Sequence, residues 1–202
     1  PSHKLAFVPN PVELPKATAA PQESRIILGV GRLVKQKNHA LLVEAFSDLS
    51  RNNTEWLVDI LGQGPDEAKL RSLIQKKFLS GKVRLRGMVQ DPERYYLAAG
   101  IFVLPSLYEG TPNAMLEAMS YGLPCVVADN LPGALAHIED GVTGLVFCAG
   151  DSQSLAEKLD LLIHDADLRK RIGEAGRLRM LSFAPGKVIA KWNSLGVSAC
   201  AD

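Results

Sequence analysis

The sequence lacks any hydrophobic run long enough to cross a membrane. Its longest apolar stretches, such as Ile101–Leu104, have the length of a strand, whereas a spanning helix needs roughly 18 apolar residues. Cysteine is also scarce, since the chain has only Cys125, Cys148 and Cys200, widely spaced and without a Cys-x-x-Cys pair. This spacing excludes a disulfide framework and a cysteine-based zinc site, and it favours a reducing, cytoplasmic location.

Neither sign of charge dominates. The 23 Lys and Arg residues nearly balance 22 Asp and Glu residues, so the formal net charge is +1. This balance excludes a strongly basic surface for nucleic acid and an acidic solvating tail. Hydrophobic residues make up 47% of the 202 residues and charged residues 22%, which is typical of a globular protein with a substantial core. No signal peptide is visible, and the start at Pro1 instead of Met leads us to expect a fragment of a longer protein.

Residues 1–24 are rich in proline, which excludes a long helix and predicts an interdomain linker or an edge segment. Beyond them, short apolar runs alternate with stretches whose apolar residues follow the helical period. The runs predict strands at residues 25–31, 56–61, 82–86, 101–104, 124–128 and 144–147. Helices are expected after Asn38 and at about residues 66–79, 91–99, 112–121 and 133–138, with further helices towards the C-terminus.

This alternation predicts an α/β domain over residues 25–182, built on a Rossmann-like, doubly wound parallel sheet of about six strands. Ligands of such a sheet bind at the carboxyl ends of its strands. Residues 183–202 are expected to form a C-terminal helix and tail.

Two loops at expected strand ends are candidates for binding a phosphate group. The first has Val34 where a dinucleotide fingerprint would have its third glycine, so it does not indicate a dehydrogenase. Its Arg32 and Lys37 either bind a diphosphate or are solvated loop charges. Gly62 and Gly64 of the second loop either admit a ligand close to the backbone or serve a tight connection.

The segment 105–119 is the most informative part of the sequence. Thr111 is a predicted N-cap, and Pro112 suits the first position of a helix. The N–H groups at the start of this helix, from about Asn113 to Met115, would point towards the strand ends. A helix N-terminus in that position is an anion-binding site.

Two carboxylates flank this helix start. Glu109 lies in the loop, and Glu117 follows it by eight positions, on the helix face of Asn113. Either one alone is best interpreted as an exposed residue. Together with the two loops they predict a phosphate ligand with hydroxyl-rich groups on both sides, because carboxylates accept hydrogen bonds from sugar hydroxyls.

The combination Gly31-Arg32-Leu33-x3-Lys37, Gly62-x-Gly64 and Glu109-x7-Glu117 resembles the C-terminal half of a retaining glycosyltransferase of the large family 4, which has the GT-B fold. The likeness runs from about residue 8 to about residue 195. Residues 8–12 resemble the interdomain linker of the family, and residues 141–147 resemble its late strand signature.

The resemblance assigns roles to individual residues. Arg32 and Lys37 would bind the donor diphosphate and, with Glu109, form the catalytic set. Glu109 would contact the sugar hydroxyls and Glu117 the ribose hydroxyls. The backbone of residues 86–89 would meet the base. The other residues assigned to donor binding are Gly31, Gly62, Gly64, Val89, Gly110, Thr111, Asn113, Ala114, Met115 and Leu116, the last three through amides that hold phosphate.

The implied function is transfer of a sugar from a nucleotide-diphosphate sugar, expected to be a UDP-sugar, to an acceptor hydroxyl in bacterial polysaccharide, lipopolysaccharide or glycolipid synthesis. No metal or other cofactor is expected, because no Asp-x-Asp triplet lies beside the site and the four histidines lack metal-ligand spacing. The acceptor glycan or lipid-linked sugar would bind an N-terminal domain that this chain lacks, towards which residues 183–202 would lead. The full-length enzyme is expected in the cytoplasm, in peripheral association with the inner face of the membrane.

The chain departs from the family pattern at one loop. It has Pro132-Gly133 and Ala136 where relatives carry a double glycine and a glutamate, in the loop that faces donor and acceptor in those relatives. Two alternatives stay open: a GT-B-like epimerase or phosphorylase half-domain, and a non-catalytic module that binds sugar nucleotides.

Overall fold

The computed structural model describes residues 10–199, with the side chains of residues 191 and 195–199 left out. Val8 and Pro9 of the predicted linker and the tail from residue 200 lie outside this range. The strands are β1 (Ile26–Val30), β2 (Leu57–Leu61), β3 (Val83–Gly87), β4 (Ile101–Leu104), β5 (Cys125–Ala128) and β6 (Leu145–Phe147). The helices are α1 (His39–Leu49), α2 (Glu67–Lys76), α3 (Glu93–Ala98), α4 (Asn113–Ser120), α5 (Pro132–Leu135), α6 (Ser152–His164), α7 (Ala166–Met180) and α8 (Pro185–Ala199), with short 3-10 helices η2 (Lys35–Lys37) and η3 (Leu181–Phe183).

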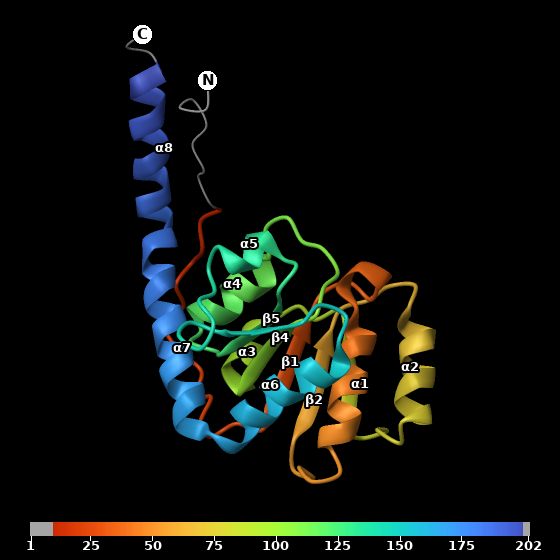
Figure 1. Ribbon diagram of the computed structural model, residues 1–202. Helices are drawn as coiled ribbons and strands as arrows, with labels where there is room; N and C mark the ends of the chain where they lie inside the picture. Colours follow the sequence, from red (N-terminus) through yellow and green to blue (C-terminus); the bar gives the residue numbers. More distant parts are fainter. Residues whose placement is uncertain (1–9, 200–202) are drawn as a thin grey trace.

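The six strands form one parallel sheet in the order β3-β2-β1-β4-β5-β6, as the sequence predicts. The chain builds outward from β1 to β3, and then crosses back to β4 on the other side of β1 (Figure 1). The loop after β1 therefore leads to one side of the sheet and the loop after β4 leads to the other. A crevice at the carboxyl ends of these two strands is the usual ligand site of such a sheet.

Helices cover both faces of the sheet. Helices α1, α2 and α6 pack together on one face, and α4 packs against α7 on the other, where α3 contacts β1. Right-handed crossovers produce this division, because reversing the direction of strand addition moves the connecting helix to the opposite face. The strands are consequently buried from both sides, which explains why β4 and β5 are apolar throughout.

The extended segment that precedes β1 is held by a buried arginine. The Arg169 guanidinium donates to the carbonyl groups of Pro21 and Gln22, and also to those of Leu162 and Ile163. Burial lowers the pKa of Arg169, although its side chain makes these four bonds. Residues 10–24 contain no helix or strand and include a turn at residues 21–23.

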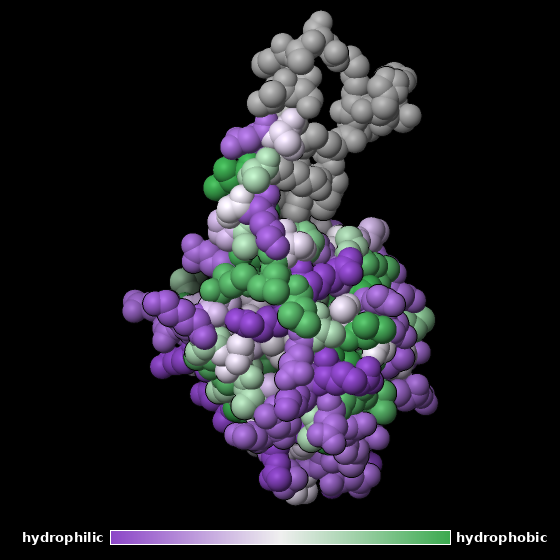
Figure 2. Space-filling model, turned by 90° about the vertical axis from the view of Figure 1, so that its left-hand side faces the viewer, coloured by the Kyte–Doolittle hydropathy of each residue, from purple (hydrophilic) through white to green (hydrophobic). Residues whose placement is uncertain are grey.

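At the C-terminal end, α7, η3 and α8 follow one another along one side of the molecule, and α8 extends beyond the body (Figure 1). They expose the hydrophobic side chains of Leu178, Leu181, Ile189 and Trp192. Figure 2, which views this side, shows hydrophobic surface interspersed with hydrophilic surface where α8 leaves the body. The predicted C-terminal helix is therefore present.

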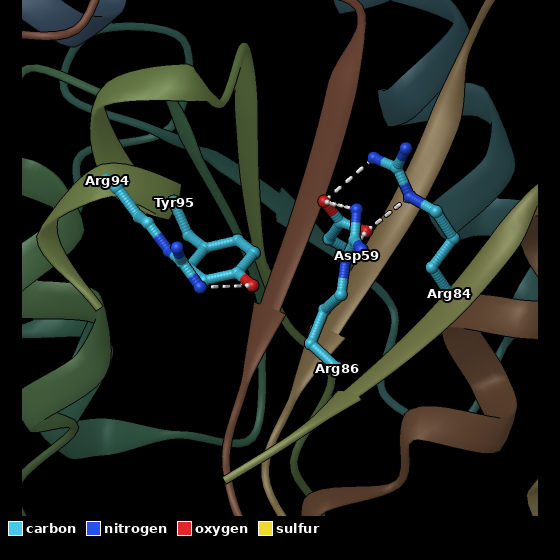
Figure 3. Close-up of polar contacts among 5 residues, drawn as sticks. All are labelled: Asp59, Arg84, Arg86, Arg94 and Tyr95. Atoms are coloured by element: carbon cyan, nitrogen blue, oxygen red, sulfur yellow. Dashed lines mark hydrogen bonds and ion pairs between the residues drawn. The ribbon is translucent and has the colours of Figure 1, made fainter. Parts of the chain in front are cut away.

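A charged cluster lies on β2 and β3. Asp59 is buried and accepts hydrogen bonds from Arg84 Nε at 2.6 Å and Arg86 Nε at 2.8 Å (Figure 3). The bond to Asp59 raises the pKa of Arg86. The guanidinium of Arg94 lies 4.8 Å from the ring centroid of Tyr95 and donates to its hydroxyl. The two arginines offset the burial of the Asp59 carboxylate, and Arg86 also belongs to the segment 86–89 that the resemblance assigns to the base.

Candidate functional site

The loops that follow β1 and β4 are bonded to one another at the carboxyl edge of the sheet. The Leu107 N–H donates to the Gln36 carbonyl at 2.8 Å, and Gln36 Nε2 donates to the Tyr108 carbonyl at 2.9 Å. Asn130 Nδ2 adds a bond of 2.8 Å to the Leu107 carbonyl. These contacts bring together two predicted site loops that lie about 70 residues apart in the sequence, as expected of neighbouring strand ends.

Lys37 and Glu109 form an ion pair across this junction. The pair is largely buried, with 19% of the Lys37 side chain and 6% of the Glu109 side chain exposed. Ser106 Oγ donates to the same carboxylate oxygen at 2.7 Å. The cation predicted to bind phosphate and the carboxylate predicted to bind sugar therefore lie side by side.

Gly31 lies under this pair. A Cβ atom at Gly31 would come within 3.1 Å of Lys37 Cδ, so the missing side chain leaves room for the lysine stem. Arg32, in contrast, is exposed, and its guanidinium has no hydrogen bond or ion pair with any residue between 10 and 199. The structure thus joins Lys37, but not Arg32, to the other site residues.

Gly62 and Gly64 allow the second loop to pack against the first. A Cβ atom at Gly62, whose φ is +134°, would lie 2.0 Å from the Gly31 carbonyl oxygen, and one at Gly64 would lie 2.3 Å from the Leu33 carbonyl oxygen. The Leu33 N–H donates to the Gln63 carbonyl at 2.9 Å. The tight packing of the two loops therefore accounts for both glycines without a ligand.

His39 supports the first loop from inside the protein. Its Nε2 lies 3.3 Å from the Gly31 carbonyl oxygen, which we assign as a hydrogen bond from the Nε2–H tautomer. Its Nδ1 is buried without a partner among the described residues. Desolvation, with a smaller contribution from the charge of Lys37, lowers the pKa of His39 to about 4, despite the opposing effect of the bond to Gly31. His39 is thus neutral and structural at pH 7.

The start of α4 differs from the prediction. Pro112 occupies the N-cap position with φ −82° and ψ 66°, so Thr111 is not the N-cap. The Pro112 carbonyl accepts from the N–H groups of Met115 and Leu116 at 2.9 and 3.1 Å. These two amides, assigned to phosphate by resemblance, therefore already have a partner. The Ala114 N–H finds no acceptor within residues 10–199 and is the amide left for an anion.

Glu117 lies beside a groove of about 670 Å³. Its Oε2 accepts a hydrogen bond of 2.9 Å from the Tyr96 hydroxyl. Asn113 lines the same groove, which confirms that it shares a helix face with Glu117. Asn113 Oδ1 accepts from Asn10 Nδ2 at 3.4 Å, so the extended N-terminal segment forms one wall.

The residues around β3 border this groove. Gln90 and Asp91 line it, directly after Val89, which is half-buried against the core. Gly110 and Thr111 are exposed in the loop between Glu109 and α4. A second cavity, of about 320 Å³, lies between α1 and α2 and is lined by none of the predicted site residues.

Sequence reasoning missed two side chains that hold the carboxylates. Ser106 donates a hydrogen bond to Glu109. Its position after Pro105, at the end of a predicted strand and within the segment 105–119, could have identified it as a site residue. Tyr96 bonds Glu117 from α3, and no local pattern connects it with α4. No cluster of three or more His, Cys, Asp or Glu side chains suited to a metal occurs in the range 10–199. Within the same residues, no helix is long and hydrophobic enough to span a membrane.

Residues 12–179 match the family model described as glycosyl transferases group 1. The chain is 29% identical to a glycosyltransferase of Haemophilus influenzae over 195 residues, which cover 96% of this chain and 55% of that protein. It is 28% identical to the amylovoran biosynthesis glycosyltransferase AmsD of Erwinia amylovora over 169 residues, 84% of this chain and 47% of AmsD. The chain spans about half the length of these curated relatives.

A solved structure supports the same fold. A variant of S. aureus TarM in complex with fondaparinux, alpha-GlcNAc-glycerol and UDP superposes on 95% of this chain with a TM-score of 0.82 and 24% identity, and the match covers 38% of the TarM chain. The fold is the Rossmann-like half of a GT-B fold. Because the family model covers most of the sequence, this chain belongs to the glycosyl transferases group 1 family.

Proposed function

We propose that this domain binds the nucleotide-sugar donor of a retaining glycosyltransferase, with a UDP-sugar as the donor. The observation that carries the proposal is the ion pair of Lys37 with Glu109 across the junction of the β1 and β4 loops. A sugar diphosphate needs a cation and a hydroxyl acceptor at adjacent positions, and the pair supplies both. The UDP in the TarM complex and the amylovoran biosynthesis named for the glycosyltransferase AmsD support the ligand and reaction class.

Transfer breaks the bond between the sugar and the diphosphate, so negative charge develops on the departing nucleotide. In this proposal Arg32, Lys37 and the Ala114 amide at the start of α4 stabilise that charge. Glu109 orients the sugar through its hydroxyls, and Glu117 binds the ribose. In this proposal the cations replace a metal ion in charge neutralisation.

Binding should extend from Glu109 to the groove beside Glu117. The base would lie along the backbone of residues 86–89, which precedes the groove-lining Gln90 and Asp91. The acceptor hydroxyl, from a glycan or a lipid-linked sugar of bacterial surface polysaccharide synthesis, would be held by a further domain of the whole enzyme. We place the whole enzyme in the cytoplasm, in peripheral contact with the membrane.

Calorimetric titration of the chain with uridine, UDP and candidate UDP-sugars tests the proposal. Glu117→Ala should weaken uridine and UDP equally, by about 1.5–3 kcal/mol for a lost charged hydrogen bond. Arg32→Ala should weaken UDP and spare uridine, with an effect that shrinks at high salt. Glu109→Ala should leave the affinity for UDP nearly unchanged and lower only the affinity for the intact UDP-sugar.

Each titration is repeated in EDTA and again with added Mn²⁺. If EDTA abolished UDP binding and Mn²⁺ restored it, charge neutralisation by Arg32 and Lys37 would be wrong. If Glu117→Ala changed nothing while Glu109→Ala abolished UDP binding, the two carboxylates would have the opposite roles. Failure of the wild-type chain to bind any of these ligands would refute the proposed function.

A further inference from the structure

The hydroxyl of Tyr96 is buried next to the only carboxylate in α4. Tyr96 is 1% exposed, and its Oη lies 2.9 Å from Glu117 Oε2 and 3.5 Å from the Ala114 carbonyl oxygen. The phenol has one proton, and the shorter contact to a charged acceptor is the stronger bond. Tyr96 therefore donates to Glu117.

The ring of Tyr96 is fixed independently of this bond. It stacks on the Tyr121 ring with centroids 5.2 Å apart and an interplanar angle of 8°, and it packs against Phe102 at 6.3 Å. Burial, followed by the charge and hydrogen bond of Glu117, raises the pKa of Tyr96 far above its usual range. The phenol consequently keeps its proton at pH 7 and can donate it in the bond to Glu117.

Glu117 itself is exposed and has a flexible side chain. The Tyr96 bond holds one carboxylate oxygen, and the structure shows no partner within residues 10–199 for Oε1, the other. A carboxylate fixed through one oxygen presents the second in a defined direction. Such preorganisation reduces the entropy lost when a ligand binds.

We propose that Tyr96 is a positioning residue that orients Glu117 towards the two hydroxyls of the ribose, so that the Tyr96–Glu117 pair makes the site selective for a ribonucleotide over its deoxy analogues. This inference rests on the proposed function, since it takes a nucleoside diphosphate as the ligand. Tyr96 lies in α3, outside every motif named in the sequence, and it would give the site a defined preference for the ribose.

The experiment compares Tyr96→Phe with Tyr95→Phe in the same 202-residue chain. Both substitutions remove one phenol hydroxyl from α3 and keep the ring, but the Tyr95 hydroxyl is bonded to Arg94 instead of Glu117 (Figure 3). Each variant is titrated with UDP, 2′-deoxy-UDP and 2′,3′-dideoxy-UDP. Urea unfolding of each variant gives a separate measure of structural damage.

Tyr96→Phe should weaken UDP binding about three- to tenfold, less than the loss of a charged hydrogen bond to the ligand itself, because Glu117 remains and only its orientation is lost. Its effect on 2′,3′-dideoxy-UDP should be less than twofold, because that ligand has no hydroxyl for Glu117 to bind. Tyr95→Phe should leave all three affinities unchanged. In a Glu117→Ala background, Tyr96→Phe should have no further effect on UDP.

Equal losses for UDP and dideoxy-UDP in Tyr96→Phe would mean that the tyrosine merely maintains the fold, and would overturn the inference. Unchanged UDP affinity in that variant would overturn it as well. In both cases the wild-type chain still binds UDP, so the proposed function would survive. Absence of UDP binding to the wild-type chain is the separate result that refutes the function.

Discussion

The ion pair of Lys37 and Glu109 makes a quantitative prediction about stability. Breaking a buried pair by removing one partner typically costs about 3–5 kcal/mol, because the remaining charge stays buried without its partner. Glu109 is the more buried of the two, so loss of Lys37 should be the more damaging change. Since 19% of the lysine side chain is exposed and Ser106 still donates to the carboxylate, we expect Lys37→Met to cost about 2–3 kcal/mol.

Glu109→Gln should cost less, about 1–2 kcal/mol, because the Lys37 ammonium can turn towards solvent and Ser106 can donate to the new amide. In the double variant neither charge remains. It should therefore be more stable than the sum of the single changes predicts, by at least about 1.5 kcal/mol, as for residues in direct contact.

Urea unfolding followed by tryptophan fluorescence measures these differences, since Trp56 is buried in the core. The exposed pair of Arg25 and Glu55 provides the control, because both side chains are more than half exposed. Arg25→Met should change stability by less than about 1 kcal/mol. Strictly additive effects of Lys37→Met and Glu109→Gln, or a Lys37→Met variant as stable as the wild type, would refute the reasoning.

Two further predictions concern His39 and Gly62. The folded-state pKa of His39 is lowered to about 4, against about 6.5 in the unfolded chain, so the unfolded state binds more protons between these values and stability should fall by up to about 3 kcal/mol as the pH drops from 6.5 to 4. His39→Gln should flatten this dependence in urea titrations at a series of pH values, whereas the same change at the exposed His164 should not; an unaltered slope in His39→Gln would contradict the assignment. Gly62→Ala should cost at least about 3 kcal/mol, because its Cβ would lie 2.0 Å from the Gly31 carbonyl oxygen at a φ of +134°. A Cβ at Gly186 meets nothing within 4 Å, so Gly186→Ala should leave the melting temperature unchanged or raise it. Equal melting temperatures for the two variants would contradict the prediction, because they would mean that the Gly62 loop shifts to accept the new side chain without cost.

Much of the fold was predictable because the strands are buried on both faces. Strands in that position are rich in apolar residues, and all six predicted strands form within one or two residues of their expected bounds. The exceptions to the apolar pattern are Asp59 in β2 and Arg84 and Arg86 in β3, which bond to one another. Helix ends were less predictable. The helix expected to reach about residue 79 ends at Lys76, because Phe78 adopts a positive φ of 58°. A positive φ is rare for an aromatic residue, and the amino-acid composition of the segment does not predict it.

The sequence by itself determined the α/β class, the order of elements and the family, because periodicity and short motifs are local properties of the chain. It also located Arg32, Lys37, Glu109 and Glu117 at the ends of strands or the start of a helix. Only the tertiary structure decided which of these groups touch. β1 pairs with β4 as well as with β2, and this order brings Lys37 to Glu109 and Ser106. The packing of α3 against α4 likewise brings Tyr96 to Glu117. Hydrogen bonds act over about 3 Å, so they depend on how distant segments pack, which no local pattern encodes.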